Sequence, residues 1–248
     1  MVSSSATILL VTPVWKDSSR LAGYGLALAH QLAATSLPIR WIIADDGSGA
    51  GERYRLLELR DRFAEIYPTV EVHFAKEHFG KGSVVRAAWA LDPCAEWLAF
   101  VDADGSINAP DLLALIARAA AEDCSVLGIR KRTATTELIQ SSWRGIVHRS
   151  FLTIARLLLG SQCEDPQCGG KVIRGKDYQR VAAGLREKGL AFDSELLYAL
   201  QRSGAKWLEI PVNWQEKKGG KVHFLRDALP MAIALLRIRF RKNLSLKG

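Results

Sequence analysis

A short apolar run at Trp97–Val101, followed by Asp102, Ala103, Asp104 and Gly105, constrains the fold of this chain more than any other segment. Continuous apolar runs of this length are typical of parallel strands that are covered on both faces. The two carboxylates then lie at the carboxyl end of a strand, where open α/β sheets bind ligands. Alternate strand residues point to one face, so Asp102 and Asp104 can share one target. A divalent cation on two phosphates fits, because Mg²⁺ prefers one or two carboxylates together with substrate oxygens. An ordinary acidic turn is the alternative.

Strand-like and helix-like segments alternate along the chain. The pattern predicts strands at 6–15, 39–44, 70–74, 97–101, 124–129, near 171–174 and at 206–214, and helices at 53–66, 84–91, 110–121 and 141–159 and from about residue 189. A further helix follows the first strand, and Ser18 or Ser19 is expected to cap it. This order favours an α/β fold with a mixed, mostly parallel sheet and helices on both faces.

We expect a single domain over 1–248, since no repeat, low-complexity segment or linker divides the chain. Within it, residues 1–130 form a nucleotide-binding half and residues 131–223 an acceptor-binding half. Residues 224–248 form a basic amphipathic tail.

The excess of positive charge narrows the classes of partner. The formal net charge is +8, and from Lys217 to the end nine residues are basic while only Asp227 is acidic. A basic tail suits nucleic acid, an anionic membrane surface or a phosphorylated substrate. No nucleic-acid-binding motif accompanies it, so we expect no nucleic-acid partner. The chain opens without the basic region of a signal peptide, and no uncharged apolar run approaches the roughly 18 to 20 residues that span a bilayer.

The four cysteines neither form a disulfide scaffold nor have the spacing of a zinc site. Reduced thiols in a cytoplasmic protein are the simplest account. Cys163 and Cys168 are expected to be packing residues, with a redox pair as the alternative.

Two further loops carry residue types that suit a nucleotide. Asp46 follows the strand at 39–44 and is placed to accept hydrogen bonds from a ribose or a base. The alternative there is a solvated turn capped by Asp45. Lys81 lies between two glycines before a helix, where backbone N–H groups favour phosphate. The spacing is not that of a Walker loop.

The second half contributes further charged residues. Arg130 leaves the strand at 124–129 in a basic cluster, and Arg144 lies in a basic helix, where it faces either phosphate or solvent. Asp193, near the start of a helix, is either an N-cap worth about 1 kcal/mol or a carboxylate aimed into the cleft. Lys221 follows two glycines in a basic turn.

The segment 224–240 mixes apolar residues with arginines and is too short and too charged to cross a membrane. It lies either at a membrane interface, with its arginines at the headgroups, or docked on the protein core.

Taken together, these residues resemble the inverting family-2 glycosyltransferases of GT-A fold, and among them the dolichyl- or polyprenyl-phosphate sugar synthases. The matching segments follow the family's order: the first strand with Pro13, 45–48, 80–82, 102–104, 128–130, 165–171, 192–195, 211–214 and 220–222. The forms Asp-Pro-Gln-Cys-Gly and Phe-Asp-x-Glu-Leu-Leu are more similar to the glucosyl branch than to the mannosyl branch. The chain departs from the family in Trp15-Lys16 after Pro13, in Ser106, and in Gly219-Gly220-Lys221, where the commoner form is Gly-Ser-Lys.

The resemblance implies transfer of a hexose from a UDP- or GDP-linked donor to a polyprenyl phosphate, with inversion at the anomeric carbon. The implied donor-binding residues are Pro13, Trp15, Asp46, Lys81, Asp102, Ala103 and Arg144. Asp102 and Asp104 would bind Mg²⁺ or Mn²⁺. Arg130, Arg144 and Lys221 would attract the acceptor phosphate, because basic groups pair with phosphate oxygens. The membrane contact is expected to be peripheral, through the tail or a membrane subunit.

The chemistry of the acceptor decides whether a base is needed. A phosphate monoester is already an anion near neutral pH, since its second pKa is about 6. A glycan or small-molecule hydroxyl acceptor would instead need a general base, and Asp193 is the candidate. A sugar-nucleotide pyrophosphorylase is disfavoured because no glycine-rich signature follows the first strand. A non-catalytic binding subunit is disfavoured by the Asp102 and Asp104 pair.

Overall fold

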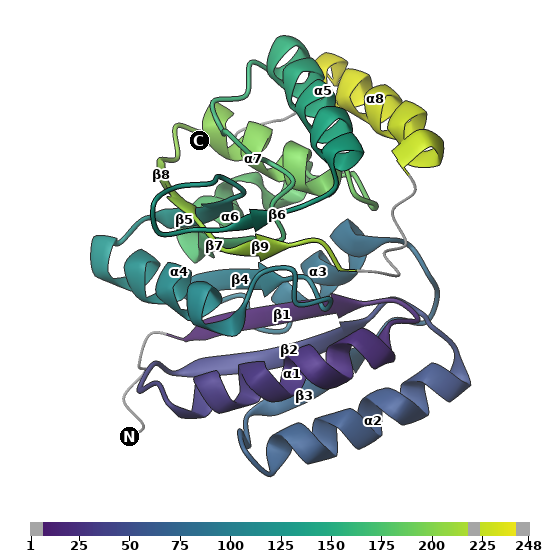
Figure 1. Cartoon of the computed structure of the whole chain (residues 1–248), viewed down its shortest axis with the longest axis vertical. Coiled ribbons are helices and arrows are strands. Elements are labelled where there is room, and N and C mark those ends of the chain that lie inside the picture. The colour runs from purple at the N-terminus through teal and green to yellow at the C-terminus, as the bar shows by residue number, and fades with distance from the viewer. Residues whose placement is uncertain (1–6, 218–223, 242–248) are drawn as a thin grey trace.

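A seven-stranded sheet covered by helices forms the body of the protein (Figure 1). The computed structural model describes residues 7–217 and 224–241, except for the side chains at 142–144, 146–151 and 224–228. The strand order is β3-β2-β1-β4-β7-β5-β8. The strands are β1 (Ile8–Val14), β2 (Ile39–Asp45), β3 (Val70–Phe74), β4 (Trp97–Val101), β5 (Ser125–Ile129), β7 (Gly170–Arg174) and β8 (Trp207–Pro211).

The helices cover both faces of this sheet, as the sequence predicts. On one face lie α1 (Ser18–Ala33), α2 (Ala50–Ala64) and α4 (Ala109–Glu122), and on the other α3 (Lys81–Trp89), α6 (Gly175–Val181) and α7 (Phe192–Arg202). Successive residues of β1 alternate between the two layers: Leu10 packs with the first group and Leu9 with the second. Burial on both faces explains why the strand reads as a continuous apolar run.

One strand runs against the others. β7 pairs antiparallel with β4 and with β5, whereas β1 pairs parallel with β2 and β4. In the described sheet, β5 has β7 and β8 as its neighbours, and both of them follow residue 130. The two predicted halves therefore share one sheet.

Several local expectations were wrong. The N-cap of α1 is Asp17, not Ser18 or Ser19, and its carboxylate bonds Arg20 instead of capping the helix. α3 begins at Lys81 and not at residue 84, because Gly80, with a φ of 109°, turns the chain directly into the helix. α6 and a short 3₁₀ turn at Ala182–Gly184 were not expected.

The expected strand at 206–214 is divided in two. β8 ends at Pro211, and β9 (Trp214–Gln215) pairs with β6 (Leu138–Ile139) in a separate two-stranded sheet. Asn213, between them, donates from its backbone N–H to Asp111 Oδ2 at 2.5 Å. This contact turns the chain away from the main sheet.

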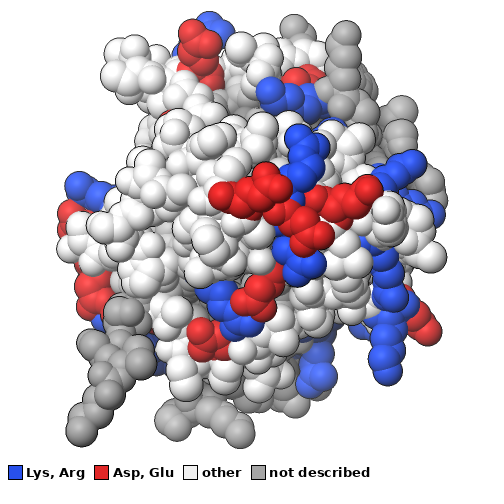
Figure 2. Space-filling view, turned by 90° about the horizontal axis from the view of Figure 1, so that it is seen from below, with Lys and Arg blue, Asp and Glu red and all other residues white. Residues whose placement is uncertain are grey.

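The charges on the face seen in Figure 2, at the end of the molecule where α2 and β3 lie, are of both signs and interspersed. Ion pairs also join opposite charges on the elements at this end, as between Arg40 of β2 and Glu71 of β3 and between Arg60 and Asp61 of α2. The excess of positive charge is therefore not gathered into a basic patch on this face.

The tail helix α8 (Phe224–Phe240) lies beside α5 (Ser142–Leu159) above the sheet (Figure 1). Ala234, Leu235 and Ile238 are buried together with Leu159 of α5 and Tyr198 of α7. Of the two arrangements considered for this segment, the structure of residues 224–241 therefore has the helix docked on the protein core. Among the described residues, no helix is long and apolar enough to cross a membrane.

The two inner cysteines lie on opposite faces of the sheet. Cys168 packs in the cluster with α1, and Cys163 in the cluster with α3. Both are free thiols, and burial raises the pKa of Cys168 to about 12. They are packing residues, as expected.

Candidate functional site

The turn after β4 places two carboxylates at the edge where β1, β2 and β4 end. Asp102 Oδ1 lies 2.9 Å from Lys81 Nζ, and Asp104 Oδ2 lies 3.3 Å from Arg20 Nη1. Asp102 also donates its backbone N–H to Gly169 O at 3.0 Å, which ties the turn to the start of β7. Ala103, between the two, is buried in the apolar cluster that includes α1. The two aspartates therefore contact cations from different helices.

Behind Asp102, four charged side chains form a closed group. Lys81 Nζ lies 3.2 Å from Asp193 Oδ2, and Lys171 Nζ lies 3.2 Å from Asp193 Oδ1. Lys171 is 0% exposed and also donates to Cys168 O. Two ammonium groups thus balance two carboxylates. A buried charge is tolerated where it is paired in this way.

Burial and the neighbouring charges shift two of these groups. Burial alone would lower the pKa of Lys81, but the carboxylates of Asp102 and Asp193 outweigh it, and the pKa rises. Burial raises the pKa of Asp102, against the opposing effect of Lys81, and Asp104 and Asp193 add to the rise. Lys81 is therefore a fixed positive charge beside Asp102.

Asp193 reaches this group because α7 packs closely on α3. A Cβ atom on Gly82 would lie 2.3 Å from Phe192 Cβ, so only glycine allows the contact. The N-cap of α7 is Ala191, and Asp193 lies in the first turn, with its side chain directed at the two lysines. Of the two roles considered for Asp193, that of N-cap is excluded.

The turn that bears Lys81 rests on the loop at 185–188. Ser83 donates its backbone N–H to Lys188 O at 3.0 Å. Glu195, which is fully buried, holds this loop by accepting from the backbone N–H of Glu187 at 2.8 Å. Arg241, directly after α8, pairs with both Glu195 and Glu187. Ion pairs therefore connect the tail helix to the loop beside Lys81.

At the ends of β1 and β2, Asp46 organises a second group. Its carboxylate accepts from the backbone N–H of Phe79 at 3.0 Å and of Gly80 at 2.7 Å. His78 Nδ1 lies 2.8 Å from the same carboxylate, and its ring stacks on Trp15 with centroids 4.1 Å apart. Asp46 and Asp45 are both buried, so this is not a solvated turn. Pro13, in β1, pairs in register with Ala44 of β2.

Arg130 is held by a bidentate ion pair. Its Nε and Nη2 atoms donate to the two carboxylate oxygens of Asp165, each at 2.7 Å, and its guanidinium lies over the Trp214 ring. Burial would lower the pKa of Arg130, but Asp165 outweighs it, and the pKa rises. The side chain of Arg144 in α5 and all of Lys221 lie outside the described residues. Their expected roles stay predictions.

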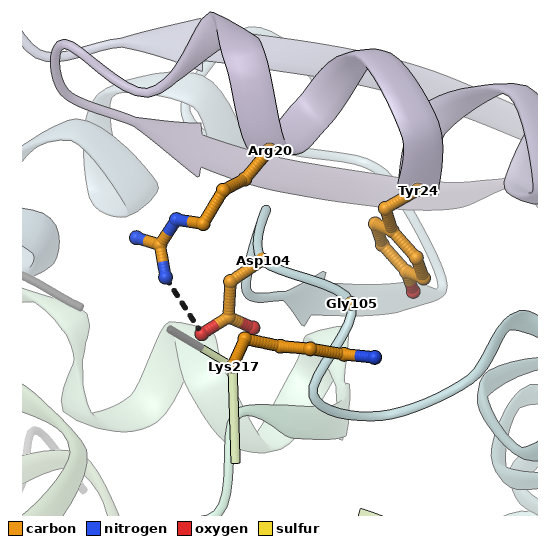
Figure 3. A pocket seen from close by; sticks show the side chains of 5 residues that line it. All are labelled: Arg20, Tyr24, Asp104, Gly105 and Lys217. Atoms are coloured by element: carbon orange, nitrogen blue, oxygen red, sulfur yellow. Dashed lines mark hydrogen bonds and ion pairs between the residues drawn. The ribbon is translucent and has the colours of Figure 1, made fainter. Parts of the chain in front are cut away.

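A pocket of about 340 Å³ opens on the other side of the turn, next to Asp104 (Figure 3). Its lining residues are Arg20, Tyr24, Asp104, Gly105 and Lys217. Burial raises the pKa of the Tyr24 phenol, and Asp104 and Asp102 add to the rise. The sequence did not point to Arg20, Tyr24 or Lys217, since single polar residues in a helix or a loop carry no distinguishing pattern.

Lys171 is a further residue of the candidate site for which the sequence predicts no role. Its position inside the short buried strand Gly170–Arg174 was the available signal, since lysine is almost never fully buried unless it is paired.

The carboxylates fit a hard divalent cation that is only partly bound by protein. Within residues 7–217 and 224–241, no group of three or more histidine, cysteine, aspartate or glutamate side chains is placed to hold a metal. Asp102 and Asp104 thus supply at most two ligands of this kind. Mg²⁺ is usually bound by one or two carboxylates, with phosphate and water oxygens completing its shell.

Comparison with known proteins gives one consistent result. The family model described as "Glycosyl transferase family 2" matches residues 10–181. The dolichyl-phosphate beta-glucosyltransferase of Dictyostelium discoideum is 28% identical over 208 residues, which cover 81% of this chain and 62% of that protein. The Saccharomyces cerevisiae protein of the same name is 27% identical over 216 residues, with 81% and 64% covered. The chain thus spans under two thirds of the length of these relatives.

Solved structures agree on the fold. Glucosyl-3-phosphoglycerate synthase of Mycobacterium tuberculosis superposes with a TM-score of 0.67 at 15% identity, covering 95% of this chain and 81% of that one. S. aureus TarS, solved with UDP-GlcNAc, gives a TM-score of 0.59 at 12% identity, covering 95% of this chain and 67% of that one. The expected GT-A fold is confirmed, and so is the closer likeness to the glucosyl branch than to the mannosyl branch.

Proposed function

This chain belongs to glycosyltransferase family 2, and from that membership we propose that it transfers glucose from a nucleotide-sugar donor to a polyprenyl phosphate of dolichyl type. Inversion at the anomeric carbon is part of the proposal. The names of the relatives from Dictyostelium and yeast support the sugar and the acceptor. UDP in a solved neighbour supports a uridine donor, with a guanosine donor to be tested beside it.

The observation that carries the choice of acceptor is the pairing of Asp193. Each of its two oxygens accepts from a different lysine, at 3.2 Å in both cases, and the residue is buried. A carboxylate bound in this way is poorly placed to take a proton from an acceptor hydroxyl. An acceptor phosphate needs no such base, because its second pKa is about 6. The geometry therefore favours a phosphate acceptor over a hydroxyl.

The donor would lie along the carboxyl ends of β1, β2 and β4. Pro13, Trp15 and Asp46 are the proposed contacts of the base and ribose, with the turn at Ala103 beneath. Asp102 and Asp104 would hold Mg²⁺ or Mn²⁺, which neutralises charge on the diphosphate leaving group.

The remaining proposed residues bind phosphate. Lys81 supplies a fixed positive charge beside Asp102. Arg130, already oriented by Asp165, presents a planar guanidinium suited to phosphate oxygens. Arg144 and Lys221 are proposed, from their places in the chain, to attract the acceptor.

A peripheral contact with the cytoplasmic face of a membrane completes the proposal. The outward surface of α5 and α8 exposes large apolar side chains: Ile154, Leu157, Leu229, Ile233, Leu236 and Phe240. Leu157 is 80% exposed and Phe240 is 75% exposed. Arg156, Arg237 and Arg239 are exposed on the same two helices. Apolar residues flanked by arginines are typical of helices that lie in a membrane interface.

The decisive experiment is a transfer assay with UDP-glucose and GDP-mannose, with and without Mn²⁺ or Mg²⁺, using a short polyprenyl phosphate. We expect metal-dependent formation of a lipid-linked glucose, abolished by Asp104→Ala. Asp61→Ala is the matched control, because Asp61 is an exposed residue of α2. Donor hydrolysis without transfer to lipid phosphate would contradict the proposed acceptor.

The pH dependence of the same assay tests the role of Asp193. We expect the rate to rise with the second ionisation of the acceptor phosphate, near pH 6, in both the wild type and Asp193→Asn. Asp193→Asn should be slower because it removes the carboxylate that Lys81 and Lys171 share, but it should keep this profile. If the rise of the rate with pH disappears in Asp193→Asn, Asp193 is the general base, and the hydroxyl acceptor is favoured.

Vesicle binding tests the membrane contact. Replacing Leu229 and Phe240 with glutamine should weaken binding to phosphatidylglycerol-containing vesicles roughly tenfold or more, since burying such a side chain stabilises by about 1.5–3 kcal/mol. Leu57→Gln, in α2, is the control. Equal binding of all variants would exclude this surface.

A further inference from the structure

The pocket beside Asp104 contains a buried hydroxyl group for which the described residues provide no partner. Tyr24 is 9% exposed, and its phenolic oxygen is closed off from solvent without a hydrogen bond. Buried polar groups in folded proteins are almost always paired. Leaving one unpaired destabilises the folded protein. An unpaired donor at this place therefore points to an acceptor atom that a ligand supplies.

Two further side chains of the pocket, Arg20 and Lys217, are hydrogen-bond donors, and Asp104 is its one carboxylate. Arg20 is oriented by Asp17, to which its Nε donates at 2.8 Å, and this leaves Nη1 directed at Asp104. Lys217 carries an ammonium group, which donates to Gln215 Oε1 at 2.8 Å. In Figure 3 the Lys217 ammonium and the Tyr24 hydroxyl point to the same side of the turn at Gly105.

A guanidinium, an ammonium and a phenol face this pocket beside the single carboxylate of Asp104, so its lining carries one net positive charge and favours an oxyanion as the ligand. Hydrogen bonds between charged partners are shorter and stronger than neutral ones. A metal ion in addition to the one proposed at Asp102 and Asp104 is disfavoured, because Arg20 and Lys217 would repel it. The volume of about 340 Å³ accommodates a phosphate together with part of the group that it is attached to.

We propose that this pocket binds a phosphate group of one of the two substrates, with Tyr24, Lys217 and Arg20 donating to its oxygens. The inference rests on the proposed function, because it is that function which brings phosphates to Asp104. Arg20 Nη1 carries two N–H bonds, so it can donate one to the phosphate and keep the other on Asp104 while Nε and Nη2 stay bound to Asp17. The phosphate comes from the donor diphosphate or from the lipid acceptor, and the experiment separates the two.

The test is Tyr24→Phe, which removes one oxygen atom and leaves the packing of the ring. Because the hydroxyl is unpaired in the protein alone, the variant should unfold in urea at the same concentration as the wild type or higher. Tyr54→Phe, at an exposed position in α2, is the control. The binding arm measures UDP with Mn²⁺ by calorimetry, and the transfer arm measures KM for a short polyprenyl phosphate.

We expect the dissociation constant for UDP or the KM for the acceptor to rise roughly tenfold or more in Tyr24→Phe, because the variant loses a hydrogen bond to a charged oxygen. A change in the first assigns the pocket to the donor, and a change in the second assigns it to the acceptor. Lys217→Met should weaken the same step.

Normal values in both arms for Tyr24→Phe would overturn the inference and leave the proposed function standing. A wild-type protein that neither binds UDP nor transfers to lipid phosphate would overturn the proposed function, and the pocket proposal with it.

Discussion

The two carboxylates of one turn, Asp102 and Asp104, face opposite environments. On the side of Asp102, Lys81, Lys171 and Asp193 are packed together, and each charge touches an opposite one. On the side of Asp104 lies an open pocket with a partly exposed ion pair and the unpaired hydroxyl described above. On the first side Lys81, Lys171 and Asp193 are buried and paired in the protein alone, and Asp102, whose side chain is 40% exposed, stays open to the proposed metal. The second side contains a hydroxyl group without a partner among the described residues. We infer that the first fixes the geometry of the turn and that the second receives a ligand.

The largest effect is expected on the closed side, from Lys171→Met. The substitution keeps the length of the side chain but leaves Asp193 and the Cys168 carbonyl without their shared donor. Removing one partner of a buried ion pair costs about 3–5 kcal/mol. Urea unfolding measures this loss, with Lys176→Met at an exposed position of α6 as the control. A loss below about 1 kcal/mol would show that the charges of the closed side are not interdependent.

A smaller effect is expected at the wall of the open side, from Gly105→Ala. Gly105 has a φ of 67°, and a Cβ atom there would lie 2.9 Å from the Tyr24 ring. Gly204 has a similar φ, of 75°, but no atom beyond its chain neighbours lies within 4 Å of the position that a Cβ atom would take there. Both alanine variants should lose about 1–2 kcal/mol from backbone strain.

The difference between these two variants isolates the contact with the Tyr24 ring. We expect Gly105→Ala to be less stable than Gly204→Ala, and to bind UDP or the lipid acceptor more weakly. Equal stability and equal binding would mean that the ring moves freely, and the pocket would then not be preformed.

The smallest effect is expected from Arg20→Gln. The Arg20 side chain is 20% exposed, and ion pairs near the surface are worth about 0–1 kcal/mol. Its stability should therefore stay within about 1 kcal/mol of the wild type, while phosphate binding weakens. Arg55→Gln, at an exposed position of α2, serves as the control. A stability loss as large as that of Lys171→Met would remove the distinction between the two sides.

Much of the fold was predictable because its signals are local. Runs such as Trp97–Val101 and Ile8–Val11 are apolar at every position, and burial on both faces demands this. The direction of β7 was not predictable, since Gly170–Arg174 has the same pattern whichever way it runs. Choice of neighbour depends on the rest of the sheet and not on the strand itself.

The candidate site likewise has residues that the sequence predicts and residues that it does not. Asp102, Asp104 and Asp193 could be named because acidic residues follow a strand or open a helix, and Lys81 because glycines flank it. Their pairing could not be predicted, since it depends on how closely α3 and α7 approach. Tyr24 could not be found at all, because its unpaired hydroxyl is a property of the pocket and not of the sequence around it.

The reversed strand β7 has a consequence for the order in which the protein assembles on the ribosome. Strands β1 to β4 can pair as soon as they are synthesised, but β5 gains its first neighbour only when residues 170–174 have emerged. Asp102 can donate its backbone N–H to Gly169 O only at that same stage. Contacts between residues distant in sequence form late, because closing a long loop is entropically costly. The nascent chain therefore carries an unfinished substrate site until its last third has been translated.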